Sequence, residues 1–269
     1  MITNKQNLPL KTLCIAQISD PHLFADTKAL HHGANVFDNL TKVVSHIASN
    51  EAINVIIFTG DLTQDHSDLS YQRFVEVFEK QKRLTPHFNT PVYYLAGNHD
   101  EIVLLDKYLC NAPFKSNKTI NVTNWQIQLI QSKSDSPAGF VTQAELQQLN
   151  NNKDDTKFQL LFMHHHPVDV DYFIDKHGLI NQEQFWQHIG QLNQFDKVKA
   201  IACGHVHRGI KIPAYSKDKI HCVEVLTCPA TSIQFDPSKT FVAALPENPA
   251  YRVIDLYSDG TLQTQLFSV

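Results

Sequence analysis

Short runs of apolar residues recur along the chain, with little alternation between apolar and polar positions inside each run. They are rich in Ile, Val, Leu and Phe, which is typical of β-strands covered on both faces. We expect five such strands before residue 208: Thr12–Ile18, Ile53–Thr59, Pro91–Ala96, Phe158–Met163 and Lys199–Cys203.

Between these runs, apolar residues recur at the three- and four-residue spacing of an amphipathic helix. Helices are expected around Val36–Ile47, Tyr71–Phe78, Leu104–Tyr108, Glu145–Leu149 and Asn181–Leu192, with Thr142 as an N-cap and Glu145 completing a capping box. Alternation of strands and helices predicts βαβ units and a mostly parallel sheet.

The C-terminal part has a different pattern, because its apolar runs have no long helices between them. We expect strands at Trp125–Ile130, Ile210–Ile212, His221–Leu226, Phe241–Ala244, Tyr251–Leu256 and Thr261–Phe267, and a second, more antiparallel sheet built from them. No repeat or linker interrupts the 269 residues. The sequence therefore predicts one α/β domain over residues 1–269, with a β-rich part over 208–269.

Composition excludes several classes of protein. The chain is 42% hydrophobic and 19% charged, and its formal net charge of −4 favours neither nucleic-acid nor membrane-surface binding. No run approaches the roughly 18 apolar residues of a membrane span. The segment Met1–Leu10 lacks the apolar region of a secretory signal, and the five cysteines have no CxxC spacing. We expect reduced thiols and a cytoplasmic protein.

The five predicted buried strands all end in Asp, Asn or His, often beside glycine or proline. The blocks are Ser19-Asp20-Pro21-His22, Gly60-Asp61, Gly97-Asn98-His99-Asp100, His164-His165-His166-Pro167 and Gly204-His205-Val206-His207. In open α/β sheets, ligand sites form beyond the carboxyl ends of the strands, so we expect these blocks to meet. Nitrogen and oxygen donors without sulfur suit Mn, Fe, Zn, Co or Ni better than calcium.

A pair of cations would also suit the charge of a phosphate ester. Two divalent ions carry four positive charges, and two carboxylates with one hydroxide remove three of them. About one positive charge then remains, which matches a singly charged phosphodiester, and paired metal ions are known to support in-line displacement at phosphorus. The blocks therefore predict a two-metal site for phosphoryl chemistry.

In this order, the five blocks resemble the pattern of the calcineurin-like metallophosphoesterases: D-x-H, G-D, G-N-H-D, a histidine after a strand, and G-H-x-H. The runs Gly60–Asp65 and Thr227–Phe235 add a likeness to the bacterial class III cyclic-nucleotide phosphodiesterases. The resemblance implies a four-layer αββα sandwich of two mixed β-sheets flanked by helices, with two metal ions at the strand ends. It implies hydrolysis of 3',5'-cyclic AMP to 5'-AMP by a metal-bridging hydroxide.

The resemblance also implies roles for individual residues. Asp20, His22 and His207 are expected to bind the first metal, Asp61 to bridge, and Asn98, His165 and His205 to bind the second. His99 and Asp61 are the expected catalytic residues. The substrate is expected to contact His22, Asp61, Asn98, His99 and His207. Asp100 is expected to orient His99 or cap the next helix. The metals implied are Fe²⁺ or Mn²⁺, with Zn²⁺, Co²⁺ or Mg²⁺ as alternatives.

One of the three consecutive histidines, His164, His165 and His166, is expected to be the metal ligand. Neighbouring side chains in a strand point to opposite faces, and Pro167 favours an extended His166. The family's ligand stands two residues before the proline, which selects His165 and turns His164 and His166 away. One departure from the family pattern is Gln131, in the run Ile130-Gln131-Ser132, which stands where relatives often have Asp. That Asp is not a metal ligand in the family, but its replacement puts local support and substrate preference in question.

Two alternatives to a cyclic-nucleotide phosphodiesterase stay open. One is a metallophosphoesterase acting on another ester, such as a glycerophosphodiester, a nucleotide monoester or a lipid-linked pyrophosphate. A monoester would favour extra basic groups, and only Arg208 and Lys211 lie close to a block. The other is an inactive scaffold that binds proteins, a role that conflicts with the presence of all seven ligands. His31 and His32 are interpreted as part of a solvated loop.

Overall fold

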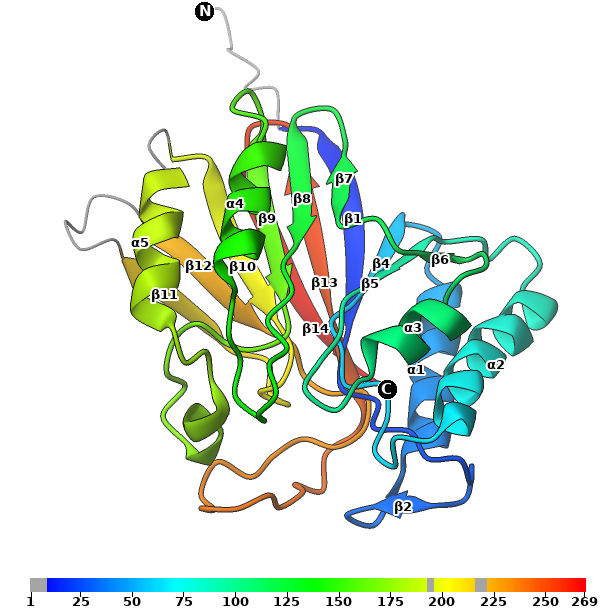
Figure 1. The fold of residues 1–269 in the computed structure, drawn as a ribbon. Helices are drawn as coiled ribbons and strands as arrows, with labels where there is room; N and C mark the ends of the chain where they lie inside the picture. Colours follow the sequence, from blue (N-terminus) through cyan, green and yellow to red (C-terminus); the bar gives the residue numbers. More distant parts are fainter. Residues whose placement is uncertain (1–8, 193–195, 216–221) are drawn as a thin grey trace, which may run out of the picture.

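Two six-stranded sheets packed face to face form the centre of the computed structural model, which describes residues 9–192, 196–215 and 222–269 (Figure 1). In the first sheet the strand order is β14 (Leu262–Ser268), β13 (Ala250–Tyr257), β1 (Lys11–Ile18), β4 (Val55–Phe58), β5 (Val92–Tyr94) and β6 (Phe114–Lys115). In the second it is β11 (Lys211–Tyr215), β12 (Cys222–Thr227), β10 (Val198–Cys203), β9 (Phe158–Met163), β8 (Trp125–Leu129) and β7 (Thr119–Asn121).

Helices cover the outer face of each sheet and complete four layers. Figure 1 shows α1 (Val36–Ala48), α2 (Asp68–Leu84) and α3 (Ile102–Tyr108) on one side, and α4 (Gln143–Asn152) and α5 (Gln182–Leu192) on the other. Strand β1 is mostly apolar because both of its faces are covered. Leu13 and Ile15 face the layer between the sheets, whereas Ala16 and Ile18 pack under α1 and α2. The expected αββα sandwich is confirmed.

Both sheets are mixed, as the resemblance implies, but the grouping of the later strands into a more antiparallel sheet is wrong. The parallel strands β1, β4 and β5 lie in one sheet and β9 and β10 in the other. The C-terminal strands do not form an antiparallel sheet of their own, because β13 pairs antiparallel with β1 and β12 pairs parallel with β10. Apolar content alone does not say which strand an apolar segment will pair with.

Most predicted elements are confirmed within a few residues, with two exceptions in detail. Thr142 caps α4 by accepting from the backbone N–H of Glu145, but the Glu145 carboxylate accepts from the N–H of Gln131 instead of closing a capping box. The predicted strand Phe241–Ala244 is wrong. An isolated bridge joins Phe235 to Ala244, and prolines at 237 and 246 lie on either side of the predicted strand, where they prevent the pairing from extending.

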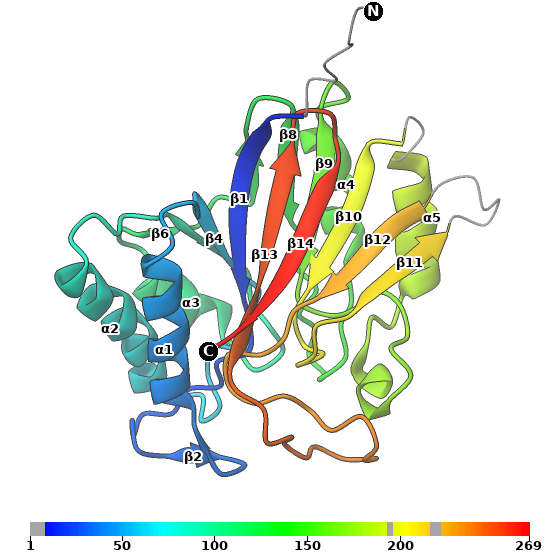
Figure 2. The ribbon, with the colours of Figure 1, turned by 180° about the vertical axis from the view of Figure 1, so that it is seen from behind.

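Several long connections gather at the end of the sandwich where the parallel strands finish. Figure 2 shows there the small β2 (Leu30–His31) and β3 (Ala34–Asn35) hairpin and the long segment that joins β12 to β13. A short 3₁₀ helix, η1 (Phe173–His177), lies at the same end. Residues 1–8, for which the sequence predicts no secretory signal, lie outside the described residues. So does His221, the first residue of the predicted strand His221–Leu226. None of the helices in the part that is described is both long and apolar enough to cross a bilayer.

Candidate metal centre

The structure brings the five polar blocks together at one edge of the sandwich. Asp20 and His22 follow β1, Asp61 follows β4, and Asn98 with His99 follow β5, all in the first sheet. The histidine triplet follows β9 and the pair His205 and His207 follows β10, both in the second sheet. Four overlapping groups of donors lie here: Asp20, His22 and His207; His22, Asp61 and His99; Asp20, Asp61 and His164; and His164, His165 and His205. Within each group, the donor atoms lie within 4.8 Å of one another.

The backbone is strained where these blocks leave their strands. Five of the candidate residues have positive φ angles between 46° and 65°: Asp20, His22, Asp61, His205 and His207. Residues other than glycine adopt this backbone region at a cost of order 1–3 kcal/mol each, and such strained residues concentrate at functional sites. Hydrogen bonds hold the turns in place: Asp20 N–H donates to Gly60 O at 2.9 Å, and His205 N–H donates to the Asp20 carboxylate at 3.0 Å.

Two glycines allow neighbouring strand ends to approach each other. A Cβ atom on Gly97 would lie 2.2 Å from Asp61 Oδ1 and 2.7 Å from His164 Cε1. Gly60 has φ +97°, and a Cβ there would lie 2.3 Å from the Gly97 nitrogen. The absence of both Cβ atoms is therefore what lets the Asp61 and Asn98 blocks close around the site.

The first donor group contains Asp20, His22 and His207. The Nε2 atoms of His22 and His207 are 3.1 Å apart, and His207 Nε2 is 3.5 Å from Asp20 Oδ1. Ligand atoms about 2.1 Å from one ion are roughly 3 Å from each other, so these spacings fit a shared cation. His207 Nδ1 donates to Ile233 O at 2.9 Å, which leaves the Nε2 lone pair directed into the site.

His164 is the centre of a second set of donors, which it forms with Asn98, Asp61 and His205. This contradicts the predicted orientation of the His164 side chain. His164 Nε2 lies 3.1 Å from Asn98 Oδ1, 3.3 Å from Asp61 Oδ2 and 3.2 Å from His205 Nδ1. Its Nδ1 donates to Thr59 O at 2.6 Å. The predicted alternation of the three side chains is wrong, because β9 ends at Met163 and the chain bends at residues 164 and 165. The two-residue period of a strand therefore does not extend through the triplet.

His165 and His166 take different partners. His165 Nδ1 lies 2.9 Å from Ser132 Oγ, and its Nε2 donates to Pro137 O at 3.2 Å. Both nitrogens of His165 therefore have protein partners, although its ring remains beside those of His164 and His205. His166 Nε2 lies 3.2 Å from Asp175 Oδ1, so it supports the η1 segment. Its ring also stacks on that of His205 with centroids 5.7 Å apart, so the prediction that it turns away from the cluster is wrong.

Burial and neighbouring charge set the protonation of the cluster. Burial holds the pKa of His22 and His205 well below the usual value, so both are neutral, the form that binds a metal ion. Burial also opposes the charge of His164, but the Asp61 carboxylate outweighs it and raises the pKa of His164 to about 9. In the same pair, the pKa of Asp61 lies well below its usual range despite burial, because His164 favours the carboxylate.

His99 and Asp100 have separate tasks. The His99 backbone N–H donates to Asp61 Oδ1 at 2.8 Å, and the His99 ring meets the His22 ring edge to face at 4.9 Å. Asp100 neither orients the His99 side chain nor caps α3, whose N-cap is Glu101. Its carboxylate accepts from the backbone N–H groups of Asp61, Leu62 and Gly97, each at 2.8 Å, and so holds two turns of the site together.

Sequence reasoning missed the support given by the segment after β12. Ser232 Oγ donates to Asp20 O at 2.6 Å, and the Phe235 ring stacks on His207 with centroids 3.8 Å apart. The run Thr227–Phe235 signalled a likeness to one class of relatives, but only the structure shows that it holds the first donor group.

The histidines at 31 and 32 are not simply a solvated loop. The His31 ring stacks on His22 with centroids 5.2 Å apart and planes 15° apart. Burial and the neighbouring histidines lower the pKa of His31 to about 3. His31 thus covers one face of a candidate ligand, a contact that no periodicity in the sequence indicates.

The Gln131 side chain stabilises the turn after β8 through two local hydrogen bonds. Its Oε1 accepts from the N–H groups of Ser132 and Lys133 at 3.0 and 3.1 Å. An acidic residue could make the same bonds, so the glutamine preserves the support of Ser132, which in turn contacts His165.

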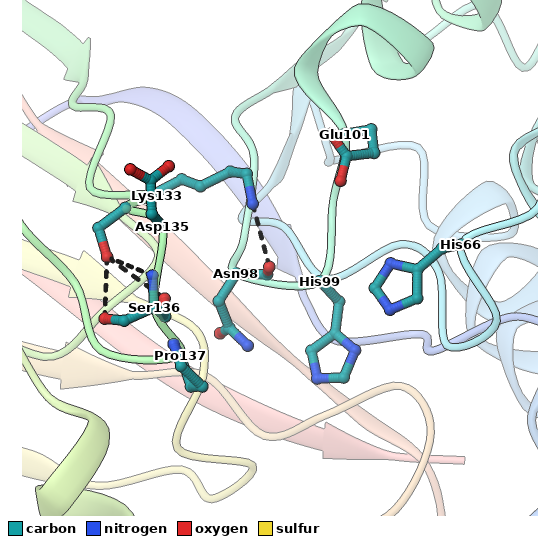
Figure 3. Close-up of a pocket in the computed structure, with 9 residues that line it drawn as sticks. His66, Asn98, His99, Glu101, Lys133, Asp135, Ser136 and Pro137 are labelled. Carbon is teal, nitrogen blue, oxygen red and sulfur yellow. Dashed lines mark hydrogen bonds between the residues drawn. The ribbon is translucent and has the colours of Figure 1, made fainter.

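Two cavities open beside the donor groups. One of about 390 Å³ is lined by His22, Asp61, Asn98, His99, His205 and His207 at its floor. The other, of about 480 Å³, is more polar and is drawn in Figure 3, where Lys133 reaches across to donate to Asn98 O at 3.2 Å and His66 lies beside His99. Asn98, His99 and Pro137 line both cavities.

The fold and these donor groups define a calcineurin-like phosphoesterase, and the chain belongs to that family, whose profile matches residues 14–209. It is 52% identical over 255 residues to a probable cyclic nucleotide phosphodiesterase of Colwellia psychrerythraea, covering 94% of each chain. It is 32% identical to the 3',5'-cyclic adenosine monophosphate phosphodiesterase CpdA of Haemophilus influenzae, covering 94% of this chain and 88% of that one.

A solved structure supports the fold independently. A purple acid phosphatase from yellow lupin seeds superposes with a TM-score of 0.57 at 14% identity, over 96% of this chain and 54% of the phosphatase. Members of the metallophosphoesterase family use a pair of divalent metal ions, and the donor groups described here could hold such a pair.

Proposed function

We propose that the protein is a metal-dependent phosphodiesterase that hydrolyses 3',5'-cyclic AMP to 5'-AMP. The observation that carries the proposal is the pair of nitrogen and oxygen donor groups that meet at Asp61 and open into one cavity. The names of the relatives from Colwellia and Haemophilus supply the substrate class. The proposal includes a cytoplasmic location, which rests on five cysteines without CxxC spacing that are expected to be reduced thiols.

We assign the ligands with one change from the sequence prediction. Asp20, His22 and His207 hold one metal, Asp61 is shared, and Asn98, His164 and His205 hold the other. His164 replaces His165, because its Nε2 faces Asp61 and Asn98 while both nitrogens of His165 already have partners. The nitrogen-rich donor set favours Fe²⁺ or Mn²⁺ over Mg²⁺.

When bound, the pair of divalent ions supplies a water of lowered pKa and positive charge for the phosphoryl oxygens. The chain positions the diester through the groups that line the cavity floor: His22, Asp61, Asn98, His99 and His207. His99 is the residue placed to stabilise charge on the departing ester oxygen, because its ring lies beside His22 and its backbone is fixed to Asp61.

A phosphodiester fits the charges around the site better than a monoester. Both cations that the sequence places near a block are engaged elsewhere: Arg208 donates to Phe235 O at 3.1 Å, and Lys211 pairs with Glu224 at 2.6 Å. Lys133 donates to the backbone carbonyl of Asn98, and Lys176, which lines the same cavity as the ligands, lies over the Phe173 ring at 5.8 Å from its centroid. A dianionic monoester would thus gain little from cations that already have partners in the protein.

The test is hydrolysis of a substrate panel by the purified protein loaded with Mn²⁺ or Fe²⁺. The panel contains cyclic AMP, cyclic GMP, 2',3'-cyclic AMP, 5'-AMP, a glycerophosphodiester and bis-p-nitrophenyl phosphate. We expect 5'-AMP from cyclic AMP, and loss of turnover in Asp61→Asn, which removes the charge shared by both donor groups. Turnover of 5'-AMP alone would refute the proposal, as would full activity in Asp61→Asn.

A further inference from the structure

The cavity of about 390 Å³ has a second end that the proposed chemistry does not use. Beside the donor groups, five apolar side chains line the cavity together with Lys176 and His177: Phe173, Ile174, Phe235, Phe241 and Val242. Phe241 is 63% exposed and Val242 is 38% exposed, two adjacent large apolar side chains left open to solvent. Exposed apolar groups at the mouth of a functional cavity are typical of ligand contact surfaces.

This wall is fastened to the metal-binding loop. The Tyr172 hydroxyl donates to Val206 O, between the two histidines of the last block. Phe235 stacks on His207 and its carbonyl accepts from Arg208. Phe173 lies 5.4 Å from Phe235 between ring centroids. The aromatic wall is therefore held at a fixed position relative to the phosphate end of the cavity.

Phe241 stands apart from the other aromatic residues of the wall. Phe235 is already covered by His207, and Phe173 contacts the rings of Phe235 and Tyr172. The segment that carries Phe241 is closed by backbone bonds from Asp236 N–H to Ala243 O and from Leu245 N–H to Gln234 O, each 2.9 Å. Phe241 sits in the loop beyond these bonds, with a free aromatic face over the cavity mouth.

We propose that this wall is the nucleobase subsite and that Phe241 is the residue on which the purine ring stacks. The inference rests on the proposed function, because a cyclic nucleotide whose phosphate lies at the donor groups must place its base in one of the two adjoining cavities. The other cavity is lined mainly by polar and charged side chains, among them Lys133, Asp135 and Ser136. Its rings are the imidazoles of His66 and His99, which already stack on each other with centroids 5.8 Å apart, so a phenyl ring for the base is found only on the Phe241 wall. Base stacking on aromatic rings tolerates different bases, so this subsite favours a purine without reading its edge.

The experiment compares two substrates that differ only in the base. Cyclic AMP is one, and the base-free 3',5'-cyclic phosphate of 1-deoxyribose is the other, both assayed by release of inorganic phosphate through a coupled phosphatase. Phe241→Ala is expected to lower kcat/KM for cyclic AMP by about fivefold or more, the loss of one stacking contact, and to leave the base-free substrate unchanged. Phe241→Trp is expected to restore the value for cyclic AMP, whereas Phe241→Leu is not.

Matched controls separate this subsite from general effects. Val103→Ala truncates an exposed apolar side chain that is 78% exposed and lies outside both cavities, and it should change kcat/KM for neither substrate. Equal losses on both substrates in Phe241→Ala would overturn the subsite, and so would no loss or full rescue by leucine. If the unmodified protein turned over no cyclic nucleotide, the proposed function would fail first; if it did so normally and Phe241→Ala matched it, only the subsite would fail.

Discussion

Replacing Gly97 by alanine tests how closely the site is packed. The new Cβ would lie 2.2 Å from Asp61 Oδ1 and 2.4 Å from Asp61 N, whereas real Cβ contacts essentially never fall below 3.0 Å. Relief from 2.2 to 3.0 Å requires Asp61 or Gly97 to move by at least 0.8 Å. Asp61 belongs to two of the donor groups, so the shift changes the geometry of both metal positions.

The size of the effect follows from that displacement. A misplacement of about 1 Å in a catalytic site can cost roughly a hundredfold in rate, or about 2.7 kcal/mol of activation free energy. The cost of overpacking adds about 1–3 kcal/mol of lost folding stability. We expect Gly97→Ala to keep its fold, to bind less metal and to lose about a hundredfold in kcat/KM.

The assay measures kcat/KM at saturating Mn²⁺, metal content per chain, and the thermal unfolding midpoint. Gly190→Ala is the matched control, because Gly190 lies in α5 and a Cβ there meets nothing within 4 Å. That change should preserve activity and add about 0.5–1 kcal/mol of stability. A Gly97→Ala protein with unchanged kcat/KM and two metals per chain would show that the strand ends are not closed as tightly as described.

Three further outcomes are expected. His164→Ala should bind one metal ion per chain instead of two, whereas His165→Ala should keep two with about 10–100-fold weaker affinity, and metal analysis showing the reverse would restore His165 as the ligand. His31→Ala should weaken Mn²⁺ binding in calorimetric titration while His31→Phe, which keeps a ring over His22, should not; identical affinities in all three proteins would exclude a positioning role for His31. Chelation should lower the unfolding midpoint reversibly, since a metal at a hundred times its Kd adds about 2.7 kcal/mol, and an unmoved midpoint would argue against tight binding.

The sequence predicts the strands well for a physical reason. In β1 and β9 both faces are covered, so each strand is mostly apolar, and an Asp or His follows within two residues of its end. The blocks at those ends could be grouped because strand ends of parallel sheets converge, and the structure does bring Asp20, Asp61 and Asn98 together with His205 and His207.

What could not be predicted depends on contacts between distant segments. The facing of His164 depends on where β9 stops pairing, which is set by the neighbouring strands β8 and β10. The stacking of His31 on His22 and of Phe235 on His207 joins segments that share no periodicity. The segment Phe241–Ala244 has the composition of a strand, but no partner strand is available to pair with it.

The division of the donors between the two sheets has a mechanical consequence. Asp20 and His22 stand on one sheet and His207 on the other; Asp61 and Asn98 likewise face His164 and His205. Each bound ion would act as a crosslink between the halves of the sandwich, at the one end where loops rather than core side chains meet. The number of ions bound would then depend on how the two sheets pack against each other. A movement of one sheet against the other would displace the ligands of both ions at the same time.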